Sequence, residues 1–152
     1  MRLSEALASD RIELNLKSTE KRQAIEEMVR VMRGSVDLPN AEDILECVLE
    51  QEAIETSGVE RGVAIPHARC PKIEGVTAAL GISRSGLDFE SLDGEPVQLV
   101  FLILSSESSM ASYMSVLSRT ARIFDREDNR ERVLAAQDAE EIMALVREQE
   151  PV

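Results

Sequence analysis

The order of apolar and polar residues along the chain follows two periods, one typical of strands and one typical of helices. Arg11–Leu16 alternates polar and apolar side chains, which predicts a strand with one buried face. Apolar side chains recur at every third or fourth position in several longer segments, which predicts amphipathic helices. These helices cover Leu3–Ala8, a segment that begins at a Ser18 or Thr19 cap and ends at Gly34, then Ala41–Ala53, Ala111–Phe124, Arg130–Ala136 and Ala139–Glu148. In the helix over Ala111–Phe124, the residues predicted to face the core are Met114, Leu117, Ala121 and Phe124.

The apolar run Val97–Leu104 is the longest in the sequence, and such a run is typical of a strand that helices cover on both faces. A second strand is predicted over Val76–Ser83, followed by a turn at Arg84–Gly86 and a short extended piece. A brief strand over Val63–Ile65 ends at the following proline, which cannot donate to a sheet. Because helical and strand patterns alternate, we predict an α/β fold in one domain over residues 1–152, with a sheet that helices cover.

Composition and charge narrow the classes of function. The chain of 152 residues carries a formal net charge of −12, which disfavours binding to nucleic acid and to anionic membrane surfaces, because both attract cationic side chains. No apolar stretch reaches the roughly 18 to 20 residues that cross a bilayer, and the first residues do not resemble a signal peptide. The two cysteines, Cys47 and Cys70, fit no zinc pattern, so reduced thiols are expected. We therefore expect a cytoplasmic protein without membrane insertion, and basic protein partners remain possible.

His67 is the only histidine in the sequence, and it follows the brief strand predicted above. Its ordinary pKa of about 6.5 allows a histidine to act near neutrality as a neutral nucleophile or as a cation. The segment 61–73 contains Arg61, Arg69 and Lys72 and no carboxylate, in a chain that is otherwise strongly acidic. Cationic side chains and small residues of this kind suit a phosphate group. On composition alone, an ordinary loop histidine beside three cations remains an open interpretation.

Other catalytic and metal-binding chemistries lack the residues that they need. His67 and Cys70 form an H-x-x-C pair, but zinc takes three or four protein ligands and there is no second histidine. The sequence has no phosphate-binding P-loop, no G-x-G-x-x-G and no G-x-S-x-G elbow that would make Ser57 a nucleophile beside His67. We therefore predict no metal and no cofactor.

The segment Thr56–His67 reads TSGVERGVAIPH, which closely resembles the active-site signature of EIIA domains of the phosphotransferase system, of the fructose/mannitol type that includes the nitrogen-regulatory EIIA proteins. Further segments match in the same order over almost the whole chain: Leu87–Phe89, Asp93–Val97, the apolar strand to Leu104, Leu117–Ala121, Leu134–Ala136 and Asp138–Ile142. The resemblance implies a single EIIA type 2 domain, with a mixed sheet flanked by helices on both faces. It also implies that His67 accepts a phosphoryl group from HPr or its nitrogen-branch homologue, and that an EIIB domain or a regulated protein lies downstream.

The resemblance further implies which residues support the phosphoryl group. Ser57 stands where the family usually has threonine and keeps a hydroxyl. Gln51 replaces a frequent arginine, and Tyr113 replaces a frequent second histidine, so two charged helpers are absent. Arg61 or Arg69 is the candidate substitute for the missing arginine.

Two functional hypotheses follow. In the first, the chain is a phosphoryl carrier and so a catalytic component of the phosphotransferase system, with His67 as its phosphohistidine. In the second, it is a regulatory binding module with weak or absent onward transfer, which controls a partner such as a kinase or a transporter. The loss of charge at Gln51 and Tyr113 favours a stand-alone regulator of the nitrogen-branch type over a component of sugar transport.

Overall fold

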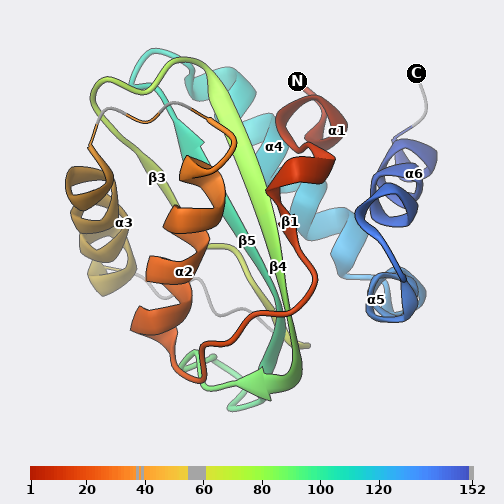
Figure 1. Ribbon diagram of the computed structural model, residues 1–152. Helices are drawn as coiled ribbons and strands as arrows, with labels where there is room; N and C mark the ends of the chain where they lie inside the picture. The colour runs from red at the N-terminus through yellow and green to blue at the C-terminus, as the bar shows by residue number, and fades with distance from the viewer. Residues whose placement is uncertain (37, 39, 55–60, 151–152) are drawn as a thin grey trace.

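A mixed five-stranded sheet forms the centre of the computed structural model, which describes residues 1–36, 38, 40–54 and 61–150 (Figure 1). The strands lie in the order β1 (Ile12–Glu13), β4 (Val76–Leu87), β5 (Val97–Ser105) and β2 (Val63–Ala64), and β3 (His67–Arg69) also pairs with β5. The central pair of β4 and β5 is antiparallel, whereas the three short strands run parallel to their neighbours. The predicted α/β fold with a mixed sheet is confirmed.

The central strand β5 buries side chains on both faces of the sheet, because successive residues of a strand point to opposite sides. Leu99, Phe101 and Ile103 pack into one hydrophobic cluster, and Val100, Leu102 and Leu104 pack into another. All six side chains are at most 1% exposed. Two buried faces explain why the sequence of this strand is continuously apolar.

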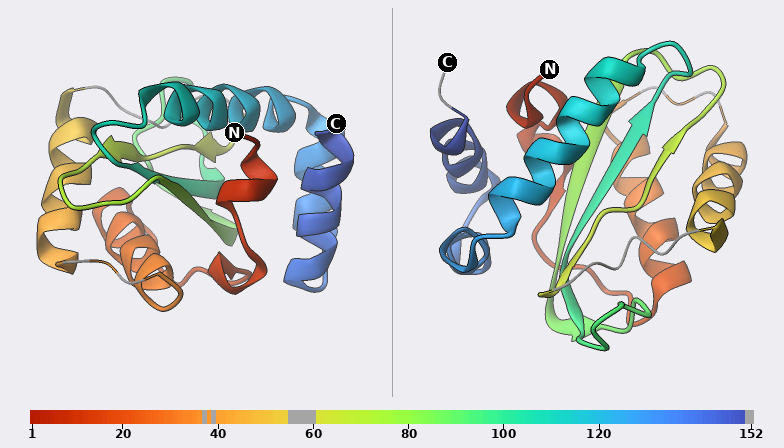
Figure 2. Two further views of the ribbon diagram at one scale, coloured as in Figure 1. Left: turned by 90° about the horizontal axis from the view of Figure 1, so that it is seen from above. Right: turned by 180° about the vertical axis from the view of Figure 1, so that it is seen from behind.

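Helices cover both faces of the sheet (Figure 2). On one face lie α2 (Lys21–Arg33) and α3 (Ala41–Ile54). The other cluster is closed by α1 (Leu3–Ala6), α4 (Met110–Phe124), α5 (Glu127–Ala135) and α6 (Ala139–Gln149), and a 3-10 turn over Ser9–Arg11 leads from α1 into β1. None of the described helices is long and apolar enough to pass through a bilayer.

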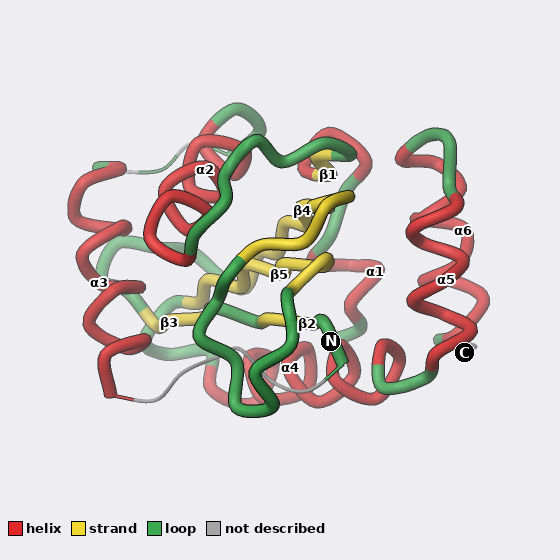
Figure 3. Tube along the Cα trace, turned by 90° about the horizontal axis from the view of Figure 1, so that it is seen from below, coloured by secondary structure: helices red, strands yellow, loops and turns green. Residues whose placement is uncertain are grey.

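The two short strands β2 and β3 lie in line along the same edge of β5 (Figure 3). Pro66 lies between them and has no N–H to donate, but its carbonyl still accepts a hydrogen bond from the amide of Ile103 at 3.0 Å. The chain therefore resumes pairing at once, and His67 pairs in register with Ile103 near the carboxyl end of β5. This register brings the histidine close to the loop that leads into α4.

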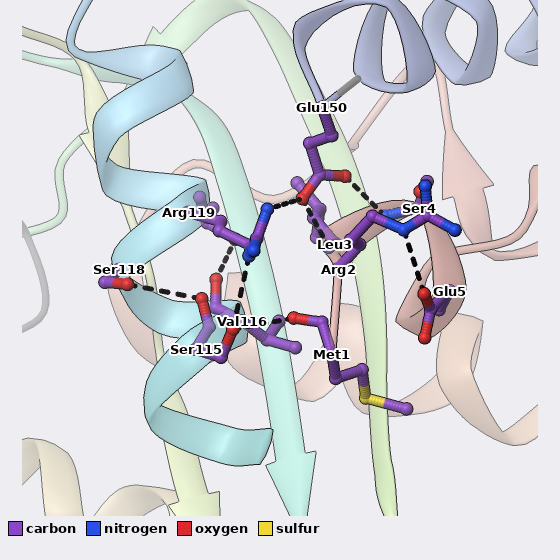
Figure 4. A network of polar contacts seen from close by, with 11 residues as sticks. Met1, Arg2, Leu3, Ser4, Glu5, Ser115, Val116, Ser118, Arg119 and Glu150 are labelled. Atoms are coloured by element: carbon purple, nitrogen blue, oxygen red, sulfur yellow. Dashed lines mark hydrogen bonds and ion pairs between the residues drawn. The ribbon is translucent and has the colours of Figure 1, made fainter. Parts of the chain in front are cut away.

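The buried carboxylate of Glu150, at the end of the last helix, bonds to the first residues of the chain and to α4 (Figure 4). Glu150, which is 4% exposed, accepts hydrogen bonds from the amides of Leu3 at 2.8 Å and Ser4 at 2.9 Å. Its Oε2 atom also lies 3.5 Å from Nη1 of Arg119 on α4. We call these contacts the terminal clasp.

The buried face of α4 differs from the prediction. Met114 is 53% exposed and Ala121 is exposed, whereas Tyr113, Val116 and Thr120 are buried. Phe124 is buried as predicted, and Leu117 is half-buried. Thr120 tolerates burial because its hydroxyl donates to the carbonyl of Val116 at 2.8 Å. The error in phase matters because the exposed flank of α4 contributes to the site described below.

Several predicted boundaries are also wrong. β4 continues through the turn predicted at Arg84–Gly86 and ends at Leu87, with an irregularity in its pairing where Gly86 has a φ of +81°. The predicted strand Arg11–Leu16 is reduced to Ile12–Glu13. Neither Ser18 nor Thr19 caps α2, because Glu20 holds the cap position and the Ser18 hydroxyl donates to Glu27 at 2.6 Å.

Candidate functional site

His67 is half-buried in β3, with one ring nitrogen held by the backbone. Its Nδ1 atom lies 2.5 Å from the carbonyl oxygen of Ile65. A carbonyl oxygen can only accept a hydrogen bond, so Nδ1 carries a proton, and in the neutral ring the lone pair is therefore on Nε2. Nε2 is the nitrogen through which the neutral imidazole can act as a nucleophile.

The ring of His67 lines a cavity of about 540 Å³. The helix α3 contributes Gln51 to this cavity and β3 contributes His67 and Arg69. The remaining lining residues come from the loop after β5 and from α4: Glu107, Met110, Tyr113, Met114 and Leu117. The fold thus brings together three elements that are far apart in the sequence, and we call the space between them the His67 cavity.

Arg69 is the cation of the His67 cavity among its described lining residues. It lies two positions after His67 in the same strand, so both side chains project from the same face of the sheet. Burial raises the pKa of Tyr113 and the Arg69 guanidinium, which lines the same cavity, opposes that rise. Arg69 is exposed and can therefore meet an anion that enters from solvent.

Arg61 bonds to acidic residues outside the described cavity lining. Its backbone amide donates to Oδ2 of Asp93 at 2.9 Å, and its guanidinium pairs with the carboxylate of Asp125 at the end of α4. The backbone of Arg61 has a φ of +67°, a conformation that is uncommon outside glycine. Of the two arginines considered as substitutes for the missing one, the described cavity lining includes Arg69 and not Arg61.

Tyr113 lies beside the histidine on α4. Its ring centroid is 6.0 Å from that of His67, with the rings tilted by 54°. Burial raises the pKa of Tyr113 to about 12, so its hydroxyl stays protonated at neutral pH. Tyr113 therefore supplies a hydrogen-bond donor without charge.

The other predicted supporting residues have different outcomes. Gln51 is half-buried and lines the His67 cavity, where its amide can donate a hydrogen bond. Ser57 lies outside the described residues. Sequence reasoning did not assign Glu107, Met110, Met114 and Leu117 to the site, although their position just before or within the helix after the apolar strand was a usable signal.

Within the described part of the chain, no cluster of three or more His, Cys, Asp and Glu side chains is arranged to hold a metal ion. Cys70 lies three positions after His67, and both cysteines are free. The described lining offers one imidazole nitrogen, one cation and two neutral donors, a set suited to a phosphoryl group, together with the carboxylate of Glu107.

Comparison with protein families gives a match over residues 5–149 to the family described as "Phosphoenolpyruvate-dependent sugar phosphotransferase system, EIIA 2". The chain is 34% identical over 148 residues to the PTS system fructose-specific EIIABC component of Bacillus subtilis, covering 97% of this chain but only 23% of that protein. It is 33% identical over 146 residues to a nitrogen regulatory protein of Bradyrhizobium diazoefficiens, covering 96% of this chain and 95% of that protein. The chain thus spans about a quarter of the first relative and nearly all of the second.

Solved structures show the same architecture. The nitrogen regulatory protein IIA-Ntr of Neisseria meningitidis superposes with a TM-score of 0.88 at 30% identity, covering 95% of this chain and 98% of that one. The IIA mannitol structure from Escherichia coli superposes with a TM-score of 0.74 at 19% identity, covering 91% of this chain and 97% of that one, and this likeness concerns the fold alone.

Proposed function

The chain belongs to the EIIA 2 family of the phosphoenolpyruvate-dependent sugar phosphotransferase system, and from this we propose that it accepts a phosphoryl group on Nε2 of His67. The observation that carries the proposal is the 2.5 Å contact between Nδ1 and the Ile65 carbonyl, which assigns the lone pair of the neutral ring to Nε2. A nucleophile of fixed tautomer and fixed orientation loses little freedom when it reacts.

The transfer is an in-line displacement between two histidines. The lone pair of Nε2 attacks the phosphorus of the donor's phosphohistidine, a new P–N bond forms, and the bond to the donor nitrogen breaks with its electron pair returning to the donor ring. Because Nδ1 keeps its proton, the phosphorylated His67 ring carries a positive charge. The Ile65 carbonyl, already in contact with Nδ1, stabilises that charge.

The charge on the phosphoryl oxygens needs partners during this step. Arg69 offers a guanidinium, and Tyr113 on α4 and Gln51 on α3 offer neutral donors at the His67 cavity. Glu107, at the same cavity, carries charge of the same sign as the phosphoryl group and opposes it. We assign the main electrostatic role to Arg69, the cation among the described lining residues.

We further propose HPr or its nitrogen-branch homologue as the donor, and a regulated protein or an EIIB domain as the downstream partner, with the exchange in the cytoplasm. Two features support a regulator of the nitrogen branch. The chain matches 95% of the length of a nitrogen regulatory protein, and Gln51 and Tyr113 stand where charged groups are frequent in the family. The alternative of a binding module with weak or absent onward transfer is not favoured by the family match.

Incubation with phosphoenolpyruvate, Enzyme I and either HPr or its nitrogen-branch homologue tests the proposal. We expect one phosphoryl adduct by intact mass and a phosphohistidine signal by phosphorus NMR, both absent from His67→Ala. Thermal unfolding of the variant controls for folding. An adduct that survives in His67→Ala, or none in the wild type with either donor, would refute the assignment.

Gln51→Arg separates a carrier from a binding module. Restoring the guanidinium should speed phosphoryl acceptance, because a charged donor replaces a neutral one at the cavity wall. Gln51→Lys serves as the matched control, since it adds charge without the planar fork of arginine.

A pull-down that recovers the same partner with wild type and with His67→Ala would support binding that does not depend on phosphorylation.

A further inference from the structure

The two cysteines of the chain meet in the fold although they are distant in the sequence. Cys47 lies on α3 and Cys70 directly follows β3, and these two elements pack side by side (Figure 3). The Sγ atom of Cys47 lies 3.4 Å from the carbonyl oxygen of Arg69, which is the residue directly before Cys70. Both residues line a separate cavity of about 430 Å³.

The thiols differ in their access to solvent. Cys70 is 1% exposed, whereas Cys47 is partly exposed at the wall of that cavity. Burial, followed by the contact with Cys47, raises the pKa of the Cys70 thiol. Any reagent from solvent therefore meets Cys47 first, and Cys70 is held as a protonated thiol next to it.

The pair also joins two of the three elements that line the His67 cavity, α3 and β3. Cys47 lies one helical turn before Gln51 on α3, so both side chains project from the same side of the helix. Cys70 is the residue after Arg69, which carries the charge of the cavity. A covalent bond between the cysteines would therefore restrain the backbone next to Gln51 on α3 and next to Arg69 on β3.

We propose that Cys47 and Cys70 form a reversible disulfide by exchange with a low-molecular-weight disulfide, and that this crosslink slows phosphorylation of His67. The second half rests on the function proposed above. The distance between the two sulfur atoms must fall to about 2.05 Å in the bond, which draws α3 towards β3. The crosslink also removes the thiol proton that Cys47 directs at the Arg69 carbonyl.

The exchange proceeds in two balanced steps. The Cys47 thiolate attacks one sulfur of the external disulfide, forming a mixed disulfide and releasing one thiol molecule. Cys70 then loses its proton to solvent and attacks Sγ of Cys47, which forms the protein disulfide and releases the second thiol. The protein loses two hydrogens and the external disulfide gains them. Because Cys70 is a buried thiol, its attack is the slow step and should accelerate as the pH rises.

The charge around the thiols predicts which reagent reacts fastest. The cavity beside Cys47 is also lined by Asp43, Glu46 and Glu50, with Lys72 as its described cation. This excess of carboxylates should attract the dication cystamine and repel the anionic glutathione disulfide. We expect cystamine to react about 10-fold faster at low ionic strength, with the difference shrinking in salt.

The test uses the full chain incubated with cystamine or glutathione disulfide. We expect intact mass to show the loss of two hydrogens, a non-reducing peptide map to join Cys47 to Cys70, and the midpoint of thermal unfolding to rise by about 5 °C. Dithiothreitol should reverse all three. A stable mixed disulfide, a crosslink between two chains, or an equal rate with glutathione disulfide would overturn the proposal.

Cys47→Ser and Cys70→Ser are the matched controls, because each keeps a hydroxyl and removes one sulfur. Cys47→Ser should block reaction with cystamine, and Cys70→Ser should stop at the mixed disulfide. The crosslinked protein should accept phosphoryl groups several-fold more slowly than the reduced protein, and an equal rate would overturn the coupling to His67. The crosslink is read by mass, so failure of the thiol chemistry and failure of phosphorylation are told apart.

Discussion

Arg61 lies six residues before His67 and Arg69 lies two residues after it, so the sequence makes them similar candidates for holding a phosphoryl group. Their surroundings in the fold are different. The backbone amide of Arg61 donates to Asp93 and its guanidinium pairs with Asp125, whereas Arg69 projects from β3 beside His67 and lines the cavity. The charge of Arg61 is compensated by the carboxylate of Asp125, and Arg69 presents its charge to the cavity.

The difference shows that a cluster of cations in a sequence does not identify the cation that lines the cavity. Strand periodicity distinguishes the two, because residues two apart in a strand share a face and the segment containing Arg61 belongs to no strand. Four predictions test whether the roles are as separate as the geometry indicates.

Arg69→Ala should have the largest effect. Loss of a hydrogen bond to a charged group, worth about 1.5–3 kcal/mol, should slow phosphoryl acceptance about 10- to 100-fold. Stopped-flow or quench measurements with a phosphorylated donor would give the rate. Arg69→Lys should restore part of it, and a normal rate in Arg69→Ala would remove the distinction between the two arginines.

Tyr113→Phe should have an intermediate effect. The substitution removes the hydroxyl and keeps the buried ring, so the loss of one neutral hydrogen bond, about 0.5–1.5 kcal/mol, should slow acceptance about 2- to 10-fold. The same kinetic measurement applies, with thermal unfolding as a check on folding. An effect as large as that of Arg69→Ala would mean that charge is not what separates the cavity residues.

Arg61→Ala should leave the rate within about twofold of wild type and lower the free energy of unfolding by about 0–1 kcal/mol, as expected for an exposed ion pair. Urea unfolding of Arg61→Ala, Asp125→Ala and the double variant would isolate the interaction of the pair. A large kinetic defect with unchanged stability would place Arg61 in the site after all.

The titration of Tyr113 should report the smallest difference. It is the only tyrosine in a chain without tryptophan, so the absorbance of its phenolate can be followed alone. Burial raises the pKa of Tyr113 and Arg69 opposes part of that rise, so Arg69→Ala should raise the pKa further, whereas Arg61→Ala should leave it unchanged. A shift of equal size in both variants would contradict the separation.

The hydroxyl of Tyr113 also makes the free energy of unfolding depend on pH. Its pKa is about 12 in the folded chain and about 10 in an unfolded one. The unfolded state therefore loses its proton first, and the contribution of the neutral hydroxyl to stability, complete below pH 10, should be lost as the pH rises towards 12.

The sequence predicts the layers of this fold well because burial on both faces leaves a direct mark in β5. It also predicts where His67 lies in the fold, because Pro66 marks the point where the edge strand is interrupted. The buried face of α4 is harder to predict from the sequence. Methionine and alanine suggest a core face, but Tyr113 and Thr120 are buried instead, and the tertiary contacts that decide this come from elements far away in the sequence.

The end of β4 could not be predicted from its local sequence either. Arg84–Gly86 has the composition of a turn, yet the ladder to β5 carries the strand through it, and Gly86 absorbs the irregularity with its positive φ. The different surroundings of Arg61 and Arg69 could not be predicted locally for the same reason, because Asp125 is near Arg61 only in the folded chain.

The terminal clasp has a consequence for protein engineering. Glu150 bonds to the amides of Leu3 and Ser4, so the two ends of the described fold meet on the face away from α2 and α3 (Figure 1). A circularly permuted chain, with these ends joined by a short linker and new ends opened elsewhere, should keep the native arrangement. A fluorescent reporter inserted at the junction would sit beside Arg119, on the helix whose other end lines the His67 cavity.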